Sequence, residues 1–446
     1  MNGLNRRDFL KHATVAATAA SAGVSLNARG ANEKVVVGVM GLRGRGSYLA
    51  PWFAQRDDVE VRYLADVDTR LFGSRAEKIE EVAGHKPLCV QDFRRMLDDK
   101  EVQAIVSPTP DHWHALSTIL ACQAGKDVYV EKPTSHNIWE SRKMIEAARK
   151  YGRVVQVGAQ NRSAPYCYEA FDYIRTREFG PVHFVRVLNS KKRGPTSQKP
   201  DLPEPPKGVD YEMWLGPAPM RPFNENHFHY AWHWLWAYSG GDIINDGVHQ
   251  VDIARWMIDK PYPNTVCSGG GIKYFDDAQE TPDTHTVSWD YDGITMVFEQ
   301  TLWTPYMKKT PFEFRDTDQL PKWPFSGTRI EIYGANQVMF LSRHGGGWEA
   351  FDADGNSVRK QPGRFMESNH KHIANFIDCV RDRKQPNGDI EKLHHSTLLC
   401  HYGNIAYRTG QRLTIDPATE GFKDNDDANA LVKRDYRSPW VVPEEV

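Results

Sequence analysis

An apolar run that ends in a glycine-rich turn is the feature that most constrains this chain. Residues 35–40 read Val-Val-Val-Gly-Val-Met, which has the length and β-branched composition of a buried strand. Residues 41–46 follow at once with three glycines, and a stretch able to form a helix comes next. In that order, backbone amides at the helix N-terminus can bind a pyrophosphate. The pattern therefore predicts a parallel α/β domain that binds a dinucleotide.

The glycine turn departs from the usual G-x-G-x-x-G spacing, because Arg43 stands where the second glycine would be. We expect Gly44 to take over that role and Arg45 to add positive charge near the phosphates. The turn supplies six candidate cofactor-binding residues: Gly41, Leu42, Arg43, Gly44, Arg45 and Gly46.

A second apolar run, at residues 59–65, ends at Asp66. A carboxylate at this spacing from the glycine turn accepts hydrogen bonds from a ribose 2′-hydroxyl, which favours NAD over NADP. NADP remains an alternative cofactor, because the positively charged Arg62 and Arg70 are close to Asp66 in the sequence. The alternative is that Asp66 caps a helix that begins near Asp68.

Two further predicted strands, at 104–106 and 127–130, carry polar residues at their carboxyl ends. Because ligands of open parallel sheets bind beyond these ends, we expect the following segments to meet in one crevice. They are the run from Thr109 through Pro110, Asp111, His112 and Trp113 to His114, and the tripeptide Glu131-Lys132-Pro133. A last strand at 154–160 closes this half.

The second half has strand-like segments that are close together in sequence, which indicates an antiparallel sheet. They lie at 182–188, 284–290, 294–303, 329–333 and 338–343, with hairpin turns at 292–293 and 334–337. Helices near 165–178, 247–258, 369–382 and 393–408 are expected to cover one face. The uncovered face predicts a homo-oligomer, either a dimer or a tetramer.

Several of these segments together resemble the Gfo/Idh/MocA family of oxidoreductases (glucose–fructose oxidoreductase, inositol dehydrogenase and rhizopine catabolism). The resemblance rests on the glycine turn, Asp66, the 109–114 run, Glu131-Lys132-Pro133 and residues 158–162. It implies an α/β fold with an N-terminal Rossmann domain and a C-terminal α+β domain built on a large, mainly antiparallel open sheet. The expected organisation is an export signal at 1–31, a Rossmann domain at 32–161, a substrate and oligomerisation domain at 162–420 and a tail at 421–446.

The resemblance also assigns roles to residues. Lys132 would lie beside the nicotinamide and the substrate hydroxyl. The other residues assigned to the cofactor site are Thr109, Pro110, His112, His114, Glu131 and Gln160. His249 matches the acid/base histidine of the family, and its ordinary pKa of ~6.5 suits proton transfer near neutrality.

The family usually has Asp four residues before that histidine, whereas this chain has Asn245 there and Asp246 next to it. Asn245 is expected to hold the imidazole ring without stabilising its cation. The candidate catalytic set is therefore Lys132, His249, Asn245 and Asp246, and helix packing remains the alternative for His249. Asp252 is expected to form a structural ion pair with a neighbouring arginine or to cap a turn.

A long proline-rich stretch, 195–222, leads into an aromatic segment. Five of the 13 tryptophans lie between Trp214 and Trp256. Aromatic faces stack on sugars, although tryptophans also pack beneath long loops. The candidate substrate residues are Arg162, His229, Trp232, His233, Trp234 and Tyr238. We expect no metal, because no Cys or carboxylate ligand is well spaced near these histidines.

The N-terminus has the features of a targeting segment. Arg6 and Arg7 precede Phe9-Leu10-Lys11 and a weakly apolar run, which resembles a twin-arginine (Tat) signal and predicts export to the periplasm. The net charge of −2 argues against a nucleic-acid binder, and no run approaches the ~20 apolar residues of a membrane span. The six cysteines are far apart in the sequence and are expected to be buried thiols. A disulfide between two of them is the alternative.

These features favour hydride transfer between a hydroxyl of a sugar, polyol or glycoside and a nicotinamide. Because an exported enzyme has no obvious pool of free cofactor, we expect tightly held NAD or NADP, with NAD favoured. The alternative is a redox-neutral NAD-dependent glycosidase or lyase that acts through a transient 3-keto sugar. A third hypothesis is a sugar-binding protein that keeps a vestigial cofactor site.

Overall fold

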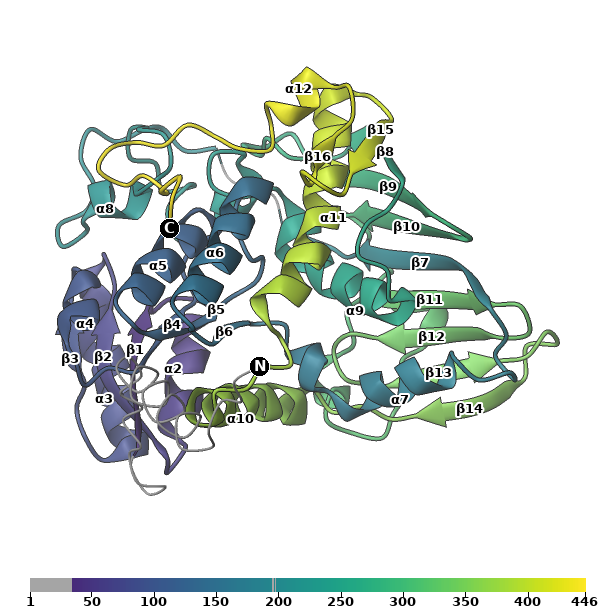
Figure 1. The fold of residues 1–446 in the computed structure, drawn as a ribbon, viewed down its shortest axis with the longest axis horizontal. Helices are drawn as coiled ribbons and strands as arrows, with labels where there is room; N and C mark the ends of the chain where they lie inside the picture. Colours follow the sequence, from purple (N-terminus) through teal and green to yellow (C-terminus); the bar gives the residue numbers. More distant parts are fainter. Residues whose placement is uncertain (1–33, 195, 197) are drawn as a thin grey trace, which may run out of the picture. The chain divides into compact units, whose positions relative to one another are not determined.

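Two β-sheets organise the chain in the computed structural model, which describes residues 34–194, 196 and 198–446 (Figure 1). The export signal expected at 1–31 lies outside the described residues. No helix in the described part has the length and apolar character needed to cross a bilayer. All six cysteines are free thiols; four are buried, Cys89 is half-buried and Cys267 is exposed.

The first sheet has six parallel strands in the order β3-β2-β1-β4-β5-β6. They are β1 (Val35–Met40), β2 (Val59–Ala65), β3 (Leu88–Val90), β4 (Ala104–Ser107), β5 (Asp127–Val130) and β6 (Val155–Val157). The connecting helices are α2 (Gly46–Ala54), α3 (Phe72–Ala83), α4 (Arg94–Asp98), α5 (Asp111–Gln123) and α6 (Ile138–Lys150). The strand order reverses between β1 and β4, so their carboxyl ends border a crevice. This is the predicted Rossmann arrangement.

The second sheet has ten strands in the order β14-β13-β12-β11-β7-β10-β9-β8-β15-β16. They are β7 (Val182–Ser190), β8 (Thr265–Gly271), β9 (Thr284–Tyr291), β10 (Ile294–Thr301), β11 (Arg329–Gly334), β12 (Val338–Ser342), β13 (Trp348–Phe351), β14 (Ser357–Gln361), β15 (Leu413–Asp416) and β16 (Gly421–Phe422). Its pairings are antiparallel except for β7 with β10, which confirms the mainly antiparallel sheet. We did not predict β8, β13, β14, β15 and β16; for example, β8 ends in three glycines, and β14 is exposed and charged.

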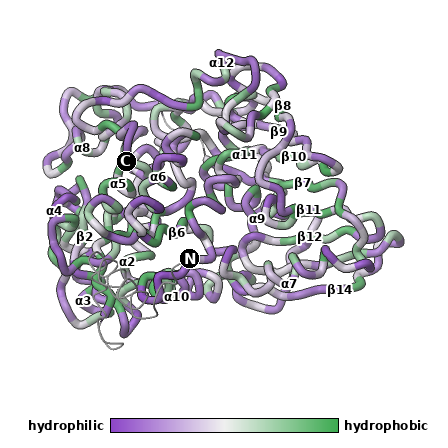
Figure 2. Tube along the Cα trace, in the orientation of Figure 1, coloured by the Kyte–Doolittle hydropathy of each residue, from purple (hydrophilic) through white to green (hydrophobic). Residues whose placement is uncertain are grey.

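Helices α7 (Pro165–Tyr173), α9 (Val248–Ile258) and α11 (Ile390–Thr409) share a hydrophobic core with the inner face of this sheet. For example, the indole nitrogen of Trp289 donates to the carbonyl of Leu399 at 3.0 Å. Figure 2 shows apolar residues along strands such as β11, whereas the outlying α12 (Asp426–Asn429) is hydrophilic. Helices therefore cover one face of the sheet, as expected from the sequence.

The helix α10 (Phe365–Asp382) differs from expectation, because it returns to the first sheet and lies beside α2 (Figure 1). The ring of Phe376 packs edge-on against Phe53 and Tyr129, with centroids 6.2 and 5.7 Å apart. The apolar stripe of α10 thus completes the core of the Rossmann domain and leaves the second sheet to the other helices.

The segment expected to be a tail, 421–446, packs against the folded protein at several buried residues. Its β16 pairs with β15, and Trp440, Val442 and Val446 are buried in the same core as Trp113 of α5. The indole rings of Trp440 and Trp113 meet edge to face, 5.2 Å apart. The chain end is therefore part of the first domain's hydrophobic core.

Candidate active site

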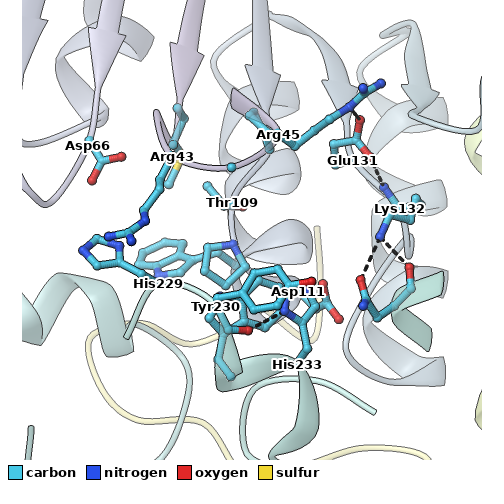
Figure 3. A pocket seen from close by; sticks show the side chains of 18 of the residues that line it. Arg43, Arg45, Asp66, Thr109, Asp111, Glu131, Lys132, His229, Tyr230 and His233 are labelled. Carbon is cyan, nitrogen blue, oxygen red and sulfur yellow. Dashed lines mark hydrogen bonds and ion pairs between the residues drawn. The ribbon is translucent and has the colours of Figure 1, made fainter. Parts of the chain in front are cut away.

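A cavity of about 380 Å³ opens at the carboxyl ends of β1, β2, β4 and β5. Its first-domain wall contains Gly41, Arg43, Gly44, Arg45, Asp66, Thr109, Pro110, Asp111, Glu131, Lys132 and Gln160. Its second-domain wall contains His229, Tyr230, Trp232, His233, Asn245, Asp246, His249 and Arg343. The fold therefore brings the four candidate catalytic residues and most candidate cofactor residues to one place (Figure 3).

The glycine turn has no room for a side chain at Gly46 but has free space beside Gly44. A Cβ on Gly46 would lie 1.9 Å from the carbonyl oxygen of Gly41, which itself has φ +95°. A Cβ on Gly44 would meet nothing within 4 Å. Only glycine fits at Gly46, and the space above Gly44 is free for a ligand.

The two arginines of the turn behave differently. The Arg45 guanidinium donates to Glu131 at 2.8 Å and to Asn369 at 3.0 Å, and it lies over the Trp52 ring. Figure 3 shows Arg45 turned toward Glu131 and Arg43 extended toward His229. Arg43 is therefore the turn's cation that faces the cavity.

Asp66 fastens the turn to the second strand. Its carboxylate accepts the backbone N–H of Leu42 at 2.7 Å and that of Asp68 at 2.9 Å. Burial raises the pKa of Asp66 to about 6, although these two hydrogen bonds lower it. The helical turn that follows, Thr69–Leu71, is capped by Asp68, so capping does not require Asp66. The buried Leu42 contributes through its backbone.

These residues fit a dinucleotide. The glycine turn leaves room for a pyrophosphate at the start of α2, and Asp66 faces the cavity at the expected ribose position. Gln160 also lines the cavity, and its buried side-chain oxygen has no hydrogen-bond partner among the described residues. A ligand donor would satisfy that oxygen.

Lys132 follows β5 and reaches across to the second domain. Its ammonium donates to the carbonyl of Asn245 at 2.6 Å and to the Asn245 side-chain oxygen at 3.4 Å (Figure 3). Desolvation lowers the pKa of Lys132, while the charges of Glu131 and Asp111 oppose that shift. The amine is thus held at the interface between the two domains.

His249 lies in the first turn of α9, buried against the cavity. Burial, together with the charges of Arg343 and Lys132, lowers its pKa well below the ordinary value. The hydrogen bonds of Asn245 run to Lys132 and, at 3.2 Å, to Asp242. Because Asn245 sits in a π-helical turn, Ile243–Gly247, it orients the lysine and not the His249 ring, contrary to expectation.

Asp111 is a functional candidate that our sequence analysis left out. It is the first residue of α5, it lines the cavity, and it accepts a 2.5 Å hydrogen bond from the Ser239 hydroxyl. Burial raises its pKa to about 7, although the charge of Lys132 and the Ser239 bond lower it. Its position directly after Thr109-Pro110 in the sequence could have identified Asp111 as a candidate site residue.

Asp246 has three cationic partners. Lys191, Lys309 and Arg343 all form ion pairs with its carboxylate, at 2.7 Å in the case of Arg343. Although burial opposes it, these charges hold the pKa of Asp246 well below its ordinary value. None of the three cations stood out in the sequence, because they are 55 or more residues from Asp246 along the chain.

Seven predicted site residues do not line this cavity, namely Leu42, Gly46, His112, His114, Arg162, Trp234 and Tyr238. His112 and His114 are fully buried: His112 contacts the Trp214 carbonyl at 2.9 Å, and His114 lies between the carbonyls of Pro133 and Thr109. Arg162 pairs with Asp252 at 2.7 Å, which confirms the structural ion pair expected for Asp252. Tyr238 is fully buried against His112, with ring centroids 5.2 Å apart. Helix and loop packing points these side chains into cores.

The aromatic candidates divide between two cavities. Trp232 and His233 line the first cavity with their rings stacked, 3.6 Å apart, and His229 lines it while bonded to Asp68 at 3.1 Å. Trp234 lines a neighbouring cavity, beneath the guanidinium of Arg193. Trp232, His229 and His233 are thus placed to meet a ligand beside Lys132.

This two-domain arrangement corresponds to a known family. Residues 34–159 match the model of an oxidoreductase family with an NAD-binding Rossmann fold. Residues 194–298 and 327–442 match the model of that family's C-terminal alpha/beta domain. The chain belongs to the Gfo/Idh/MocA family.

Within the Gfo/Idh/MocA family, two curated relatives are informative. An inositol 2-dehydrogenase from Rubrobacter xylanophilus is 32% identical over 234 residues, covering 52% of this chain and 54% of the relative. An alpha-N-acetylgalactosaminidase from Shewanella oneidensis is 25% identical over 174 residues, covering 34% of this chain and 38% of the relative. The chain therefore spans about half or less of the length of these relatives.

A solved structure shares the fold over nearly the whole described chain. The aldose-aldose oxidoreductase from Caulobacter crescentus, complexed with glycerol, superposes with a TM-score of 0.64. The match covers 86% of this chain and 100% of that chain, at 16% sequence identity. It supports the order of the two domains seen in Figure 1.

Proposed function

We propose that this protein is an NAD(P)-dependent oxidoreductase that acts on a hydroxyl of a sugar, polyol or glycoside. The observation that carries the proposal is that Lys132 and His249 line the same cavity as the glycine turn and Asp66. A bound nicotinamide would supply the hydride acceptor. The inositol dehydrogenase relative supports a carbohydrate-like substrate.

Lys132 is the better acceptor for the proton of the substrate hydroxyl. Its pKa is lowered by desolvation, which brings an amine closer to the range where it exchanges protons, and its ammonium form stabilises a developing alkoxide. His249 lies among cations that disfavour its imidazolium form, so it acts as a neutral hydrogen-bonding group. Asp111, which interacts electrostatically with Lys132, can exchange that proton near neutral pH.

The preferred cofactor in this proposal is NAD, held tightly. Asp66 would accept the ribose hydroxyl, and a 2′-phosphate would meet its negative charge. Arg43, whose charge acts on Asp66, is the group that would reduce the preference for NAD over NADP. Export to the periplasm through the Tat machinery, proposed from Arg6 and Arg7, would require the cofactor to travel with the folded protein.

A redox-neutral glycosidase is the second candidate, because the chain is also similar to an alpha-N-acetylgalactosaminidase. In that reaction one hydroxyl carbon would give a hydride to a bound nicotinamide, and the acidified neighbouring C–H would lose its proton as the aglycone leaves with a proton. Water would then add to the double bond, and the hydride would return to the ketone. Both candidates use Lys132 in the same way.

We also propose a homo-oligomer. The outer face of the second sheet carries aromatic side chains such as Phe184 and Tyr333, which contact each other at 5.4 Å and are only half-buried. A second subunit would cover them. Native mass by light scattering tests this, and a monomer at micromolar concentration would contradict it.

The test of the function begins with the cofactor. The purified protein is denatured, and the supernatant is analysed for nicotinamide by absorbance and mass. The intact protein is then given sugars, polyols and aryl glycosides, and reduced cofactor and released aglycone are measured separately. Persistent reduced cofactor supports the oxidoreductase, released aglycone without net reduction supports the glycosidase, and absence of both with sugar binding contradicts an enzyme.

A further inference from the structure

A second cavity, of about 960 Å³, adjoins the candidate active site. The two cavities share Arg43, His229, Tyr230, Asn245 and Asp246. The second one is lined by six further cations, namely Lys191, Lys192, Arg193, Lys199, Lys308 and Lys309, against the carboxylates of Glu225, Asp242 and Asp246. A ligand that reaches Lys132 can therefore extend into a strongly positive space.

Where the cavities join, cations outnumber carboxylates. Lys191 bridges Asp242, at 2.6 Å, and Asp246, which also pairs with Lys309 and Arg343. Lys132 lies close enough to lower the pKa of His249 together with Arg343. Burial and the charges of Lys191 and Arg343 lower the pKa of Lys309 to about 8, against the charge of Asp246. Enclosed cations in excess are stabilised by any anion that enters.

The outer wall adds two lysines without an acidic partner among the described residues, Lys192 and Lys308. Both side chains are exposed. Their backbones are fixed, because Lys192 forms a bridge with Trp303 and Lys308 forms one with Ser326. By contrast, Lys199 is paired with Glu225 and Arg193 with Asp277. The wall cations available to a ligand are therefore these two lysines and Lys309, whose partner Asp246 is shared with two other cations.

Five of the six cations that line only the second cavity come from parts of the chain that the family models do not match. The matches cover 34–159, 194–298 and 327–442. Lys191, Lys192 and Arg193 precede the second match, and Lys308 and Lys309 fall in its gap. Most cations of the positive wall thus lie outside the matched segments that hold Lys132 and His249.

We propose that the substrate is an anionic carbohydrate, whose carboxylate or phosphate is bound by Lys192, Lys308 and Lys309 while a hydroxyl lies at Lys132. This inference rests on the proposed function and names its substrate class. A carboxylate and a phosphate share the chemistry that an ammonium wall recognises, and the choice between them is made by experiment.

The test measures binding by calorimetry, with and without added NAD, and turnover separately. The probes are glucuronate, galacturonate and glucose 6-phosphate, with glucose and galactose as neutral counterparts. The test protein is the double variant Lys192→Gln/Lys308→Gln. The matched control is Lys360→Gln, an exposed lysine of β14. NAD affinity is recorded for each protein.

We expect at least one anionic probe to bind wild-type protein more tightly than its neutral counterpart. The double variant should weaken that probe roughly tenfold or more and should lose most of the salt dependence of its binding, since two charge contacts are removed. Lys360→Gln should match wild type. The probe with the largest loss identifies the anionic group as carboxylate or phosphate.

The inference is overturned if neutral sugars bind as tightly as all three anions, or if the double variant leaves anion binding unchanged. It is also overturned if the double variant weakens NAD to the same degree, because the wall then serves cofactor phosphates. Failure of the wild-type protein to bind NAD would instead overturn the proposed function, and anion binding without NAD would still be measured.

Discussion

Two buried ion clusters in the second domain, one of which also reaches Arg255 through Ser396, differ in whether they face the cavity. Arg162 and Asp252 form a pair in which the guanidinium donates to both carboxylate oxygens, and Ser396 adds a hydrogen bond at 2.6 Å. Asp246 instead has three cationic partners and faces the cavity. The first cluster lies away from the cavity, whereas the cations of the second can be reached by a ligand.

The difference separates a structural role from a binding role. Removing one member of a buried ion pair leaves an uncompensated charge, which costs stability. Removing one cation from a cluster with several cations around one carboxylate relieves their mutual repulsion. We therefore expect little change in the stability of the fold and a larger change in ligand binding or turnover. Four predictions test this distinction, in order of decreasing effect.

The first prediction concerns Lys132, a cation that faces the cavity. Lys132→Met should lower kcat by roughly a thousandfold or more, because the proton acceptor and the alkoxide-stabilising charge are both removed. Thermal unfolding and NAD affinity should stay close to wild type. The measurement is turnover of the best substrate alongside a melting curve, and activity within tenfold of wild type would remove Lys132 from the mechanism.

The second prediction concerns the pair of Arg162 and Asp252. Asp252→Ala should lower the free energy of unfolding by about 3–5 kcal/mol, since Arg162 would remain buried without its partner. Urea unfolding measures this. The double variant Arg162→Met/Asp252→Leu is the matched control and should recover most of the loss. Equal destabilisation by both variants would show that the charges are not the cause.

The third prediction concerns Asp111, whose pKa is raised to about 7 by burial. Because the carboxylate forms above that pH, wild-type kcat/KM should rise as pH increases through about 7. Asp111→Asn should remove this limb. The folded state of the wild type binds the proton more tightly than the unfolded state, so its stability relative to Asp111→Asn should fall as pH rises from 4 to 7. An unchanged acidic limb would exclude Asp111 from proton exchange.

The fourth and smallest effect concerns Lys309, whose pKa is lowered to about 8, mainly by burial. Lys309→Gln should change the free energy of unfolding at pH 7 by less than about 1 kcal/mol, because Asp246 keeps two other cations. Between pH 8 and 10 the unfolded wild type binds more protons, so wild-type stability should rise relative to the variant. A loss as large as that of Asp252→Ala would make the two clusters equivalent.

The contrast between the clusters also marks how far sequence reasoning reaches. The strand Val35–Met40, the glycine turn, Asp66 and Lys132 were predictable because each depends on a short, local pattern. The partners of Asp246 were not, because Lys191, Lys309 and Arg343 meet it only through the tertiary fold.

Side-chain direction was the other difficulty. His112 and His114 lie in a segment that borders the cavity, yet the helix beginning at Asp111 turns their rings into the protein interior. The same helix leaves Asp111 at the cavity. The sequence showed where the site would be, and only the rotation of α5 decided which of its residues face a ligand.

The chain end has a consequence for how the protein is made. Trp440, Val442 and Val446 are buried in the core of the Rossmann domain, and α10 covers its other side. A nascent chain that has emerged only as far as residue 161 lacks both pieces of that core. The core of the first domain is therefore complete only when residues from α10 and from 440–446 have packed onto it, so folding of the cofactor crevice depends on contacts made far along the chain.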